Sequence, residues 1–540
     1  MLEYVKVGVC LSLYNVKTLN LILLIMRKAQ YLFLFIILMS CQSVKKNNLF
    51  LEKKIPVSQL KRDVDFTYDK LKRFHPELYW YISKTDLDHK FDSLKTSFTK
   101  PLTPNEFYFQ FSPVIASINE GHLRLKAIPR KYTKAEQKAF KTKRPLFALM
   151  DYQVVGDKMF VKENRENVKN IKVGTEILKI NDENVSDLIR KYKKLYSSDG
   201  KNQTFQKYFM NLSFFNYYTL EKGYLDSVNL QTRYDNVISD VFIKRQKKTD
   251  QQVDIDKVKP KITTVQKVQD YDASSKTYNR DLKFLKTDSS IAYIKVKTFS
   301  ATLAKKFYKE TFAEIKDAKS DYLILDIRDN LGGSLSEINT LYSYLTDKEF
   351  TLIKSPEMTS RTSGLHQNYF RGQNVLSSIF SAVGYPFFLA GNYLLSSKKE
   401  GRYYFREFAS KPTKPKKDAF RGKIYVLVNG GSFSASSIIS AKLKYEKRAL
   451  IIGEETGGAN DGTVAGVNNT VTLPHSKLAL PIGLFLIRPN IEFDNNNRGV
   501  MPNIEVEPNF GDLSGCEEDK MMKWVLDDIA FRNSIVGKAK

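Results

Sequence analysis

The residues best suited to nucleophilic chemistry lie in a Ser/Gly-rich turn, NGGSFSASSIISAKLK (429–444). The turn follows the apolar run IYVLV (424–428) and enters a helical pattern, so it predicts a strand-to-helix junction. A hydroxyl at such a junction is exposed at the carboxyl end of a sheet, where the first N–H groups of the helix can stabilise an oxyanion. The alternative is that the serines only cap the helix. The competing serines are Ser432, Ser434, Ser436 and Ser437.

A second turn, DYLILDIRDNLGGSL (321–335), suits the stabilisation of negative charge. Its buried-strand pattern ends in Arg-Asp-Asn and then in Gly332 and Gly333. Glycines at that place let the backbone approach a substrate closely and present its N–H groups. The turn lacks the Lys and the spacing of a P-loop, which disfavours a phosphate site.

His122, in the segment NEGHLRL (119–125), is the candidate general base. It lies between a predicted helix and a predicted strand, next to a glycine. An imidazole with a pKa of about 6.5 can accept and return a proton near neutral pH. A structural role is the alternative, and it is the interpretation for the other histidines: His75, His89, His366 and His475.

These groups require a sheet to bring them together. From about 284 to 508, short apolar runs alternate with helical patterns, which predicts a largely parallel sheet covered on both faces. The aromatic-rich region 355–420 interrupts this core as a partly helical insertion. It is expected to form a lid, a surface facing a membrane, or a buried helical hairpin.

Two further regions precede the core. Residues 56–117 carry apolar residues at helical spacing, with a break at the prolines of 101–104. Residues 145–260 predict short strands and turns, and within them VGTEILKINDENVSDLIRKY (173–192) predicts a strand, a turn and a helix. This pattern resembles the end of a PDZ domain; an unrelated small β-rich domain is the alternative. The polar stretch 247–275 is interpreted as a linker.

The N-terminal region has the layout of a lipoprotein signal peptide. Met26 is followed by two basic residues, an apolar run of eight residues, and Leu-Met-Ser before Cys41. Because the run is too short to span a bilayer, it fits a signal peptide rather than a membrane helix. Cys41 is then the lipidated residue that anchors the protein to a membrane. An uncleaved signal anchor or a plain secretory signal is the alternative.

The composition favours a globular protein without a metal site. The net charge is +27, but the basic residues are spread along the whole chain and form no nucleic-acid-binding motif. We therefore expect no nucleic-acid partner; an anchored polyanion binder is a minor alternative. The three cysteines show neither a disulfide framework nor metal-ligand spacing, so no metal and no other cofactor are expected.

Two more segments complete a recognisable series: IIGEETGGANDGT (451–463) and IEFDNNNRGVMPNIEVEP (491–508). In their order along the chain, the five motifs resemble the S41 serine peptidases, which include C-terminal processing (tail-specific) and tricorn-like members. The resemblance runs from about 58 to 510 and implies a ClpP/crotonase-like α/β core. It implies that Ser434, the middle serine of S-x-S-A-S, is the nucleophile. The oxyanion hole would be the N–H of Ala435 with that of Gly332 or Gly333.

The sequence departs from the tail-specific pattern at the general base. Those members have a Lys where this chain has Ala459, and Lys442 and Lys444 do not replace it. Tricorn-like members use a histidine from the segment before the core, which His122 matches. Their third residue is a late acid, for which the candidates are Glu492 and Asp494, with Asn496 where an acid is expected and Glu454 as a further possibility.

The resemblance implies a serine endopeptidase that cleaves peptides or protein C-terminal tails in the bacterial envelope, on the periplasmic side. The alternative is an inactive lipoprotein that binds peptides through the PDZ-like module. The fold class expected is multidomain α/β; the sequence leaves the oligomeric state open. The expected regions are a mis-assigned extension (1–25), a signal peptide (26–40), a tether (41–55), a helical region with His122 (56–130), a PDZ-like domain with linker (131–262), the peptidase core (263–512, insertion 355–420) and a C-terminal helix (513–540).

Overall fold

A computed structural model of the chain describes ten stretches, and the two predicted residues Cys41 and Asp494 lie outside them. Within these stretches, the side chains of 277, 375–380 and 536–538 are not described. The described stretches are residues 44–143, 145–165, 168–246, 270–272, 277–285, 289–299, 303–369, 375–492, 497–507 and 519–538.

The core is a six-stranded sheet in the order β19-β16-β15-β11-β10-β9. All neighbouring strands are parallel except β9, which runs antiparallel to β10. This confirms the parallel α/β core that the alternating apolar runs predicted. The strands are β9 (Arg280–Phe284), β10 (Ile291–Val296), β11 (Tyr322–Asp326), β15 (Lys423–Val428), β16 (Ala449–Gly453) and β19 (Ile504–Glu505).

Helices cover both faces of this sheet, and the side chains of β15 alternate between them. One hydrophobic cluster contains Ile424, Val426 and Val428 together with residues of α9, α10 and α12. On the other face, Tyr425 and Leu427 pack against α14. Because successive side chains face opposite sides of the sheet and both sides are covered, the strands are apolar throughout. The helices are α9 (Ala304–Asp317), α10 (Leu335–Leu345), α12 (Ala435–Tyr445) and α14 (Lys520–Lys538).

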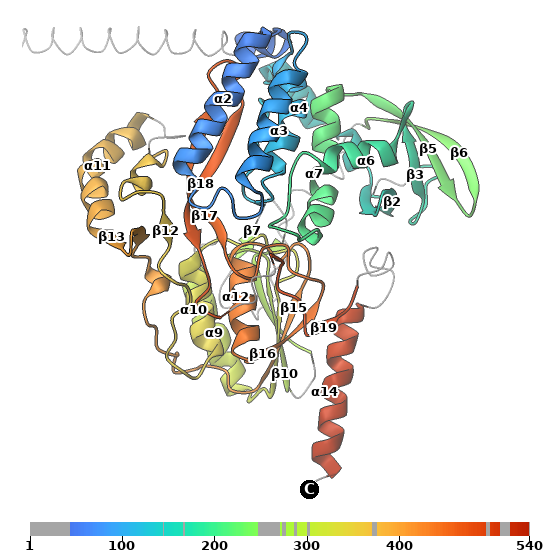
Figure 1. Cartoon of the computed structure of the whole chain (residues 1–540). Helices are drawn as coiled ribbons and strands as arrows, with labels where there is room; N and C mark the ends of the chain where they lie inside the picture. The colour runs from blue at the N-terminus through green and yellow to red at the C-terminus, as the bar shows by residue number, and fades with distance from the viewer. Residues whose placement is uncertain are drawn as a thin grey trace, which may run out of the picture.

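Residues 56–117 are largely helical, as the apolar spacing predicted, and they form three helices. They are α2 (Val57–Phe74), α3 (Lys84–Ser97) and α4 (Pro104–Ala116). The proline break ends in a capping box, in which Thr103 and Glu106 satisfy each other's backbone N–H groups. The carboxylate of Asp63 on α2 accepts N–H bonds from the turn between two long strands, β17 (Thr463–Thr472) and β18 (Ala479–Ile487). Figure 1 shows α2 alongside β18.

A β-rich unit follows in the chain, with strand order β1-β2-β3-β5-β6 and β4 paired to β3. The predicted strand, turn and helix of 173–192 are present as β3, a turn at Asn181, β4 and α6. The long helix α7 extends from this unit toward the core (Figure 1). The elements are α5 (Lys134–Thr142), η1 (Leu146–Ala148), β1 (Asp151–Val155), β2 (Lys158–Glu163), β3 (Glu176–Ile180), β4 (Glu183–Asn184), α6 (Val185–Lys193), α7 (Thr204–Lys222), β5 (Ser227–Tyr234) and β6 (Val237–Lys244).

The insertion joins β17 and β18 in a third sheet, ordered β13-β14-β12-β18-β17. Its long helix, α11, lies at the outer edge of the molecule (Figure 1) and exposes several large apolar side chains, so the insertion is not a buried helical hairpin. Over the described stretches, no helix has the length and hydropathy required to cross a membrane. The elements are β12 (Glu357–Met358), η2 (Ser363–His366), α11 (Val375–Leu395), β13 (Ser396–Lys399), β14 (Arg402–Phe405) and η3 (Phe408–Ser410).

Candidate active site

Ser434 differs from the three other serines of its turn. The hydroxyls of Ser432, Ser436 and Ser437 are buried, and each donates a hydrogen bond to a backbone carbonyl. Ser434 is half-buried, and its hydroxyl has no hydrogen-bond partner in the described part of the chain. It precedes the first residue of α12 with φ 58° and ψ −116°. A positive φ is costly for a residue with a Cβ, and such strain is concentrated at functional sites.

The turn that carries the serine is joined to the glycine turn after β11. Asp329 and Asn429 bond each other twice: the Asp329 N–H donates to the Asn429 side chain at 3.0 Å, and the Asn429 amide donates to the Asp329 carboxylate at 2.7 Å. The N–H of Phe433 also donates to the carbonyl of Asn330 at 3.0 Å. Two loops from neighbouring parallel strands are therefore held against each other at the carboxyl edge of the sheet.

Gly332 lies directly against the serine. A Cβ on Gly332 would lie 2.8 Å from the Cβ of Ser434 and 2.9 Å from the N of Ala435, and its φ is +99°. Only glycine fits there. The Gly332 N–H already donates to the Asn330 side chain at 2.9 Å. The N–H groups of Gly333 and Ala435 have no acceptor among the described residues, so of the two predicted glycines Gly333 is the free donor.

His122 reaches the serine turn from a distant part of the sequence. Its ring lies 4.6 Å from the ring of Phe433, centroid to centroid, next to the nucleophile position. The ring of Phe433 also stacks on the ring of Phe205, in α7, with a distance of 4.1 Å between the ring centroids. The Nδ1 of His122 lies 2.9 Å from the Oγ1 of Thr463, 341 positions away in the sequence. Its Nε2 has no hydrogen-bond partner within the described stretches.

Two buried carboxyl groups stand behind His122. Glu120 places an oxygen 3.5 Å from the His122 Nδ1. Asp199 accepts the N–H of Gly121 at 2.7 Å and that of Ala459 at 3.1 Å, and thereby ties the histidine segment to the Gly-rich loop after β16. Burial and the neighbouring Glu120 raise the pKa of Asp199 to about 7, against a smaller opposing effect of His122.

The same three side chains are the described residues best placed to hold a metal ion. Ligand atoms of Glu120, His122 and Asp199 lie within 4.8 Å of one another. Both Asp199 oxygens, however, already accept backbone N–H bonds. We therefore interpret Glu120 and Asp199 as a network that orients the imidazole of His122.

Residues 290–506 match the sequence model of peptidase family S41. This segment is an S41 peptidase domain. The chain accordingly carries a serine-type peptidase domain, as the motif order predicted. No curated protein sequence matches the chain.

Two solved structures of low sequence identity share the fold. Mature CPAF matches with 16% identity and a TM-score of 0.54, over 85% of this chain and 94% of that one. Mature CPAF complexed with lactacystin matches with 16% identity and a TM-score of 0.55, over 88% and 97% of the two chains. A putative peptidase from Parabacteroides merdae matches with 12% identity and a TM-score of 0.42, over 87% and 96%. At these identities the likeness to the two CPAF structures shows a common fold.

Glu492, the predicted late acid that the structure describes, does not meet His122. Glu492 is exposed, and its carboxylate accepts a hydrogen bond from Tyr445 at 3.3 Å. Tyr445 ends α12, a helix of 11 residues that begins next to Ser434. Because such a helix is about 16 Å long, Glu492 lies at the wrong end of it. Glu454 instead pairs with Lys207 at 3.3 Å.

The two lysines of α12 also point elsewhere in the S41 domain, as expected. Lys442 donates to the carbonyl of Asn490 at 2.9 Å, and Lys444 donates to that of Met501 at 2.6 Å. Neither replaces the lysine that the tail-specific members carry at the position of Ala459. Histidine is therefore the base that the described geometry offers.

Sequence reasoning missed one wall of the site, the loop from Ser197 to Phe205. Asn202 donates to the carbonyl of Thr456 at 2.8 Å, and the hydroxyl of Thr204 donates to that of Glu455 at 3.0 Å. The available signal was its composition, SSDGKNQTF, after a helical pattern. It was assigned to the PDZ-like region, yet it binds the Gly-rich loop of the S41 domain.

A cleft of about 540 Å³ leads toward the serine turn. It is lined by the edge strand β1, by α7, and by Asn429 and Glu454 of the S41 domain. Within it, the N–H of Val154 donates to the side chain of Asn211 on α7 at 2.6 Å. The cleft therefore joins the β-rich unit to the catalytic loops.

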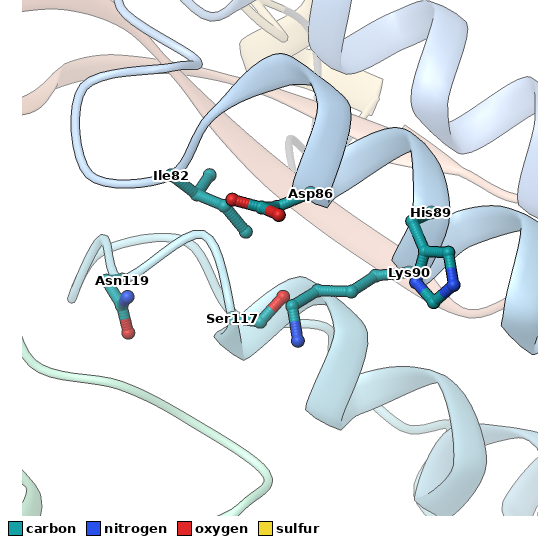
Figure 2. A pocket seen from close by; sticks show the side chains of 6 residues that line it. All are labelled: Ile82, Asp86, His89, Lys90, Ser117 and Asn119. Atoms are coloured by element: carbon teal, nitrogen blue, oxygen red, sulfur yellow. The ribbon is translucent and has the colours of Figure 1, made fainter.

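A separate pocket of about 490 Å³ lies between α3 and the end of α4. Figure 2 shows His89 and Asn119 on opposite sides of it. The carbonyl of Asn119 accepts the N–H of Gly200 at 2.8 Å, which fixes the start of the His122 segment. His89 is exposed on α3 and takes no part in the described contacts of His122.

Proposed function

We propose that Ser434 is the nucleophile of this peptidase and that His122 is its general base. The observation that carries the proposal is the contact of the His122 ring with Phe433, the residue directly before Ser434, at 4.6 Å. Because Nδ1 is engaged by Thr463, the free Nε2 is the nitrogen left to accept the serine proton.

The reaction follows from these positions. Ser434 Oγ attacks the peptide carbonyl and its proton passes to His122 Nε2. The N–H groups of Gly333 and Ala435 stabilise the oxyanion, and the imidazolium returns the proton to the leaving amine. Water then attacks the acyl-enzyme by the reverse sequence and releases Ser434. Glu120 is the acid that stabilises the imidazolium, in place of the late acid of the tricorn-like pattern.

The substrate we propose is an extended peptide or an unfolded protein tail. An edge strand such as β1 can pair through its backbone with a strand added beside it, once the side chain of Asn211 releases the Val154 N–H. The cleft between β1 and α7 supports this binding mode, since it also includes Asn429 at the start of the serine turn. A PDZ-like role for the β-rich unit is part of this proposal.

The location we propose is the bacterial envelope, with the protein held on the periplasmic side of a membrane by a lipid on Cys41. The support is the signal-peptide pattern from Met26 to Cys41 in the sequence. Labelling of the chain with radioactive palmitate, absent in a Cys41→Ser variant, tests this part separately.

The experiment that tests the catalytic assignment compares Ser434→Ala with Ser440→Ala, a buried serine on the same helix. Hydrolysis of an unfolded protein substrate should fall by roughly 10⁴-fold in Ser434→Ala and little in the control. A fluorophosphonate probe should label the wild type and the control only. Unchanged hydrolysis in Ser434→Ala refutes the assignment.

A second candidate is a binding lipoprotein that does not cut peptides. The observation that favours it is Ala459, which stands where tail-specific members carry their lysine. It predicts peptide binding in the cleft without fluorophosphonate labelling of the wild type.

A further inference from the structure

The helix α11 presents an apolar surface to solvent. Its sequence, VLSSIFSAVGYPFFLAGNYLL, contains no charged residue over 21 positions. Val383, Phe387 and Leu394 are 70%, 78% and 77% exposed. A surface helix of a globular protein normally turns its polar side outward, so α11 has the opposite arrangement.

The exposed residues of α11 form one continuous stripe, because they recur at intervals of three and four positions. We call this stripe the apolar face; its members are Ala382, Val383, Pro386, Phe387, Ala390, Tyr393 and Leu394. The inward side holds the amide of Asn392, which is buried and donates to the carbonyl of Phe388 at 2.9 Å. The polar group therefore points into the protein and the apolar groups point away from it.

Cations border the apolar face. The guanidinium of Arg361 lies 3.7 Å from the ring centroid of Tyr393. Lys398, on the strand that directly follows α11, is exposed. Among the described residues, neither Arg361 nor Lys398 pairs with a carboxylate. Their neighbours Lys399 and Arg402 do pair, with Glu400 and Glu357.

We propose that α11 lies on the surface of an anionic lipid bilayer. Phe387 and Leu394 would enter the boundary of the acyl chains, and Arg361 and Lys398 would contact lipid phosphates. An apolar helical face with a cationic border is the pattern of helices that bind in the plane of a membrane interface. The net charge of +27 acts in the same direction.

Charge also argues against a second copy of the chain as the occupant. In a symmetric contact the same surface meets itself. Such a contact through the apolar face would bring Arg361 and Lys398 of one protomer toward the same cations of its partner, and like charges disfavour association. An anionic surface has the complementary charge.

Hydrogen exchange of the full chain, with and without vesicles containing phosphatidylglycerol, tests the proposal. Peptides covering 381–395 should exchange more slowly with vesicles present, by roughly tenfold. Peptides covering β6 provide the matched control, because Phe242 there is 67% exposed and β6 and α11 lie at opposite sides of the molecule (Figure 1). Equal exchange of α11 with and without vesicles overturns the proposal, even where another segment anchors the chain.

Variants separate the contributions of the face and its border. Phe387→Asp with Leu394→Asp should abolish the protection of α11, whereas Phe242→Asp should leave it intact. Arg361→Glu with Lys398→Glu should weaken it by roughly fivefold for each cation lost, and only on anionic vesicles. Protection on phosphatidylcholine alone that equals protection on phosphatidylglycerol refutes the charged border.

A lipid-free control addresses the rival occupant. Sedimentation of the wild type and of Phe387→Asp with Leu394→Asp in buffer should give the same mass. A dimer in the wild type that the double variant abolishes would assign the apolar face to a second copy of the chain and overturn the proposal.

Discussion

Two acidic segments compete for the role of orienting the catalytic histidine, and they differ in burial. The early segment places Glu120 behind His122, where the carboxyl group is 3% exposed. The late segment places Glu492 in solvent, beside Tyr445. In the same late segment, Arg498 pairs with Glu455 at 2.6 Å, which holds the loop to the Gly-rich turn. The comparison teaches that a chain can retain an acidic residue at its usual place in a sequence motif while the carboxyl group beside the imidazole comes from another segment.

The largest effect should come from His122 itself. His122→Ala removes the group that accepts the serine proton, so kcat/KM for an unfolded protein substrate should fall by roughly 10³-fold to 10⁴-fold. His89→Ala is the matched control, because His89 is an exposed histidine of the same N-terminal region. If His122→Ala and His89→Ala had comparable activity, His122 would not be the general base, and the two acidic segments would have no catalytic histidine to orient.

The comparison itself is decided by one neutral substitution in each segment. Glu120→Gln keeps the size of the side chain but removes the charge that stabilises the imidazolium, so kcat should fall by roughly 10²-fold or more. Glu492→Gln should change kcat by less than about twofold, because its carboxylate is solvated and distant. Steady-state kinetics on both variants provide the measurement. The reverse order of effects would restore the late segment as the source of the acid.

The smallest expected effect is on the free energy of unfolding, and it concerns the Gly-rich loop after β16, which contacts both the early and the late acidic segment. Asp461 is fully buried and neither of its carboxylate oxygens has a hydrogen-bond partner in the described structure. Burial raises its pKa from 3.8 to about 6, against the opposing effect of Arg488. Between these two values the folded protein binds more protons than the unfolded chain, so the free energy of unfolding decreases as pH rises.

Asp461→Asn removes this penalty. The variant should be more stable than the wild type above about pH 6, by roughly 1–3 kcal/mol, and the two should converge below about pH 4. Urea denaturation at several pH values measures the difference. A variant that is less stable at high pH would show that the Asp461 carboxylate is needed in its charged form.

The sequence predicted the sheet because the alternating apolar runs that define its parallel strands are local patterns. Ser434 was proposed from the family resemblance, as the middle serine of S-x-S-A-S at the end of one of these strands. The choice among the serines is then explained by hydrogen bonds, which leave Ser434 as the free hydroxyl of the turn. His122 followed from the same motif series, and its contact with Phe433 agrees with that assignment.

The supporting residues escaped prediction because their contacts are long-range. Asp199 bonds Ala459 across 260 positions, and no spacing rule within the β-rich region indicates such a partner. The late acids were expected from family order, which does not determine where a loop side chain points. For the apolar pattern of 355–420 the sequence left a lid, a surface facing a membrane and a buried hairpin open, because an apolar helix pattern alone does not determine which face is exposed.

The proposed catalytic base lies before the β-rich unit in the chain, and the proposed nucleophile lies after it, so the proposed site is split by a whole folded unit. During synthesis, His122 leaves the ribosome long before the turn that it must contact. A nascent or truncated chain that ends before Ser434 therefore has no hydrolytic power. The bond between His122 and Thr463 forms only when β17 is in place. The proposed site can therefore be completed only after β17 has been synthesised.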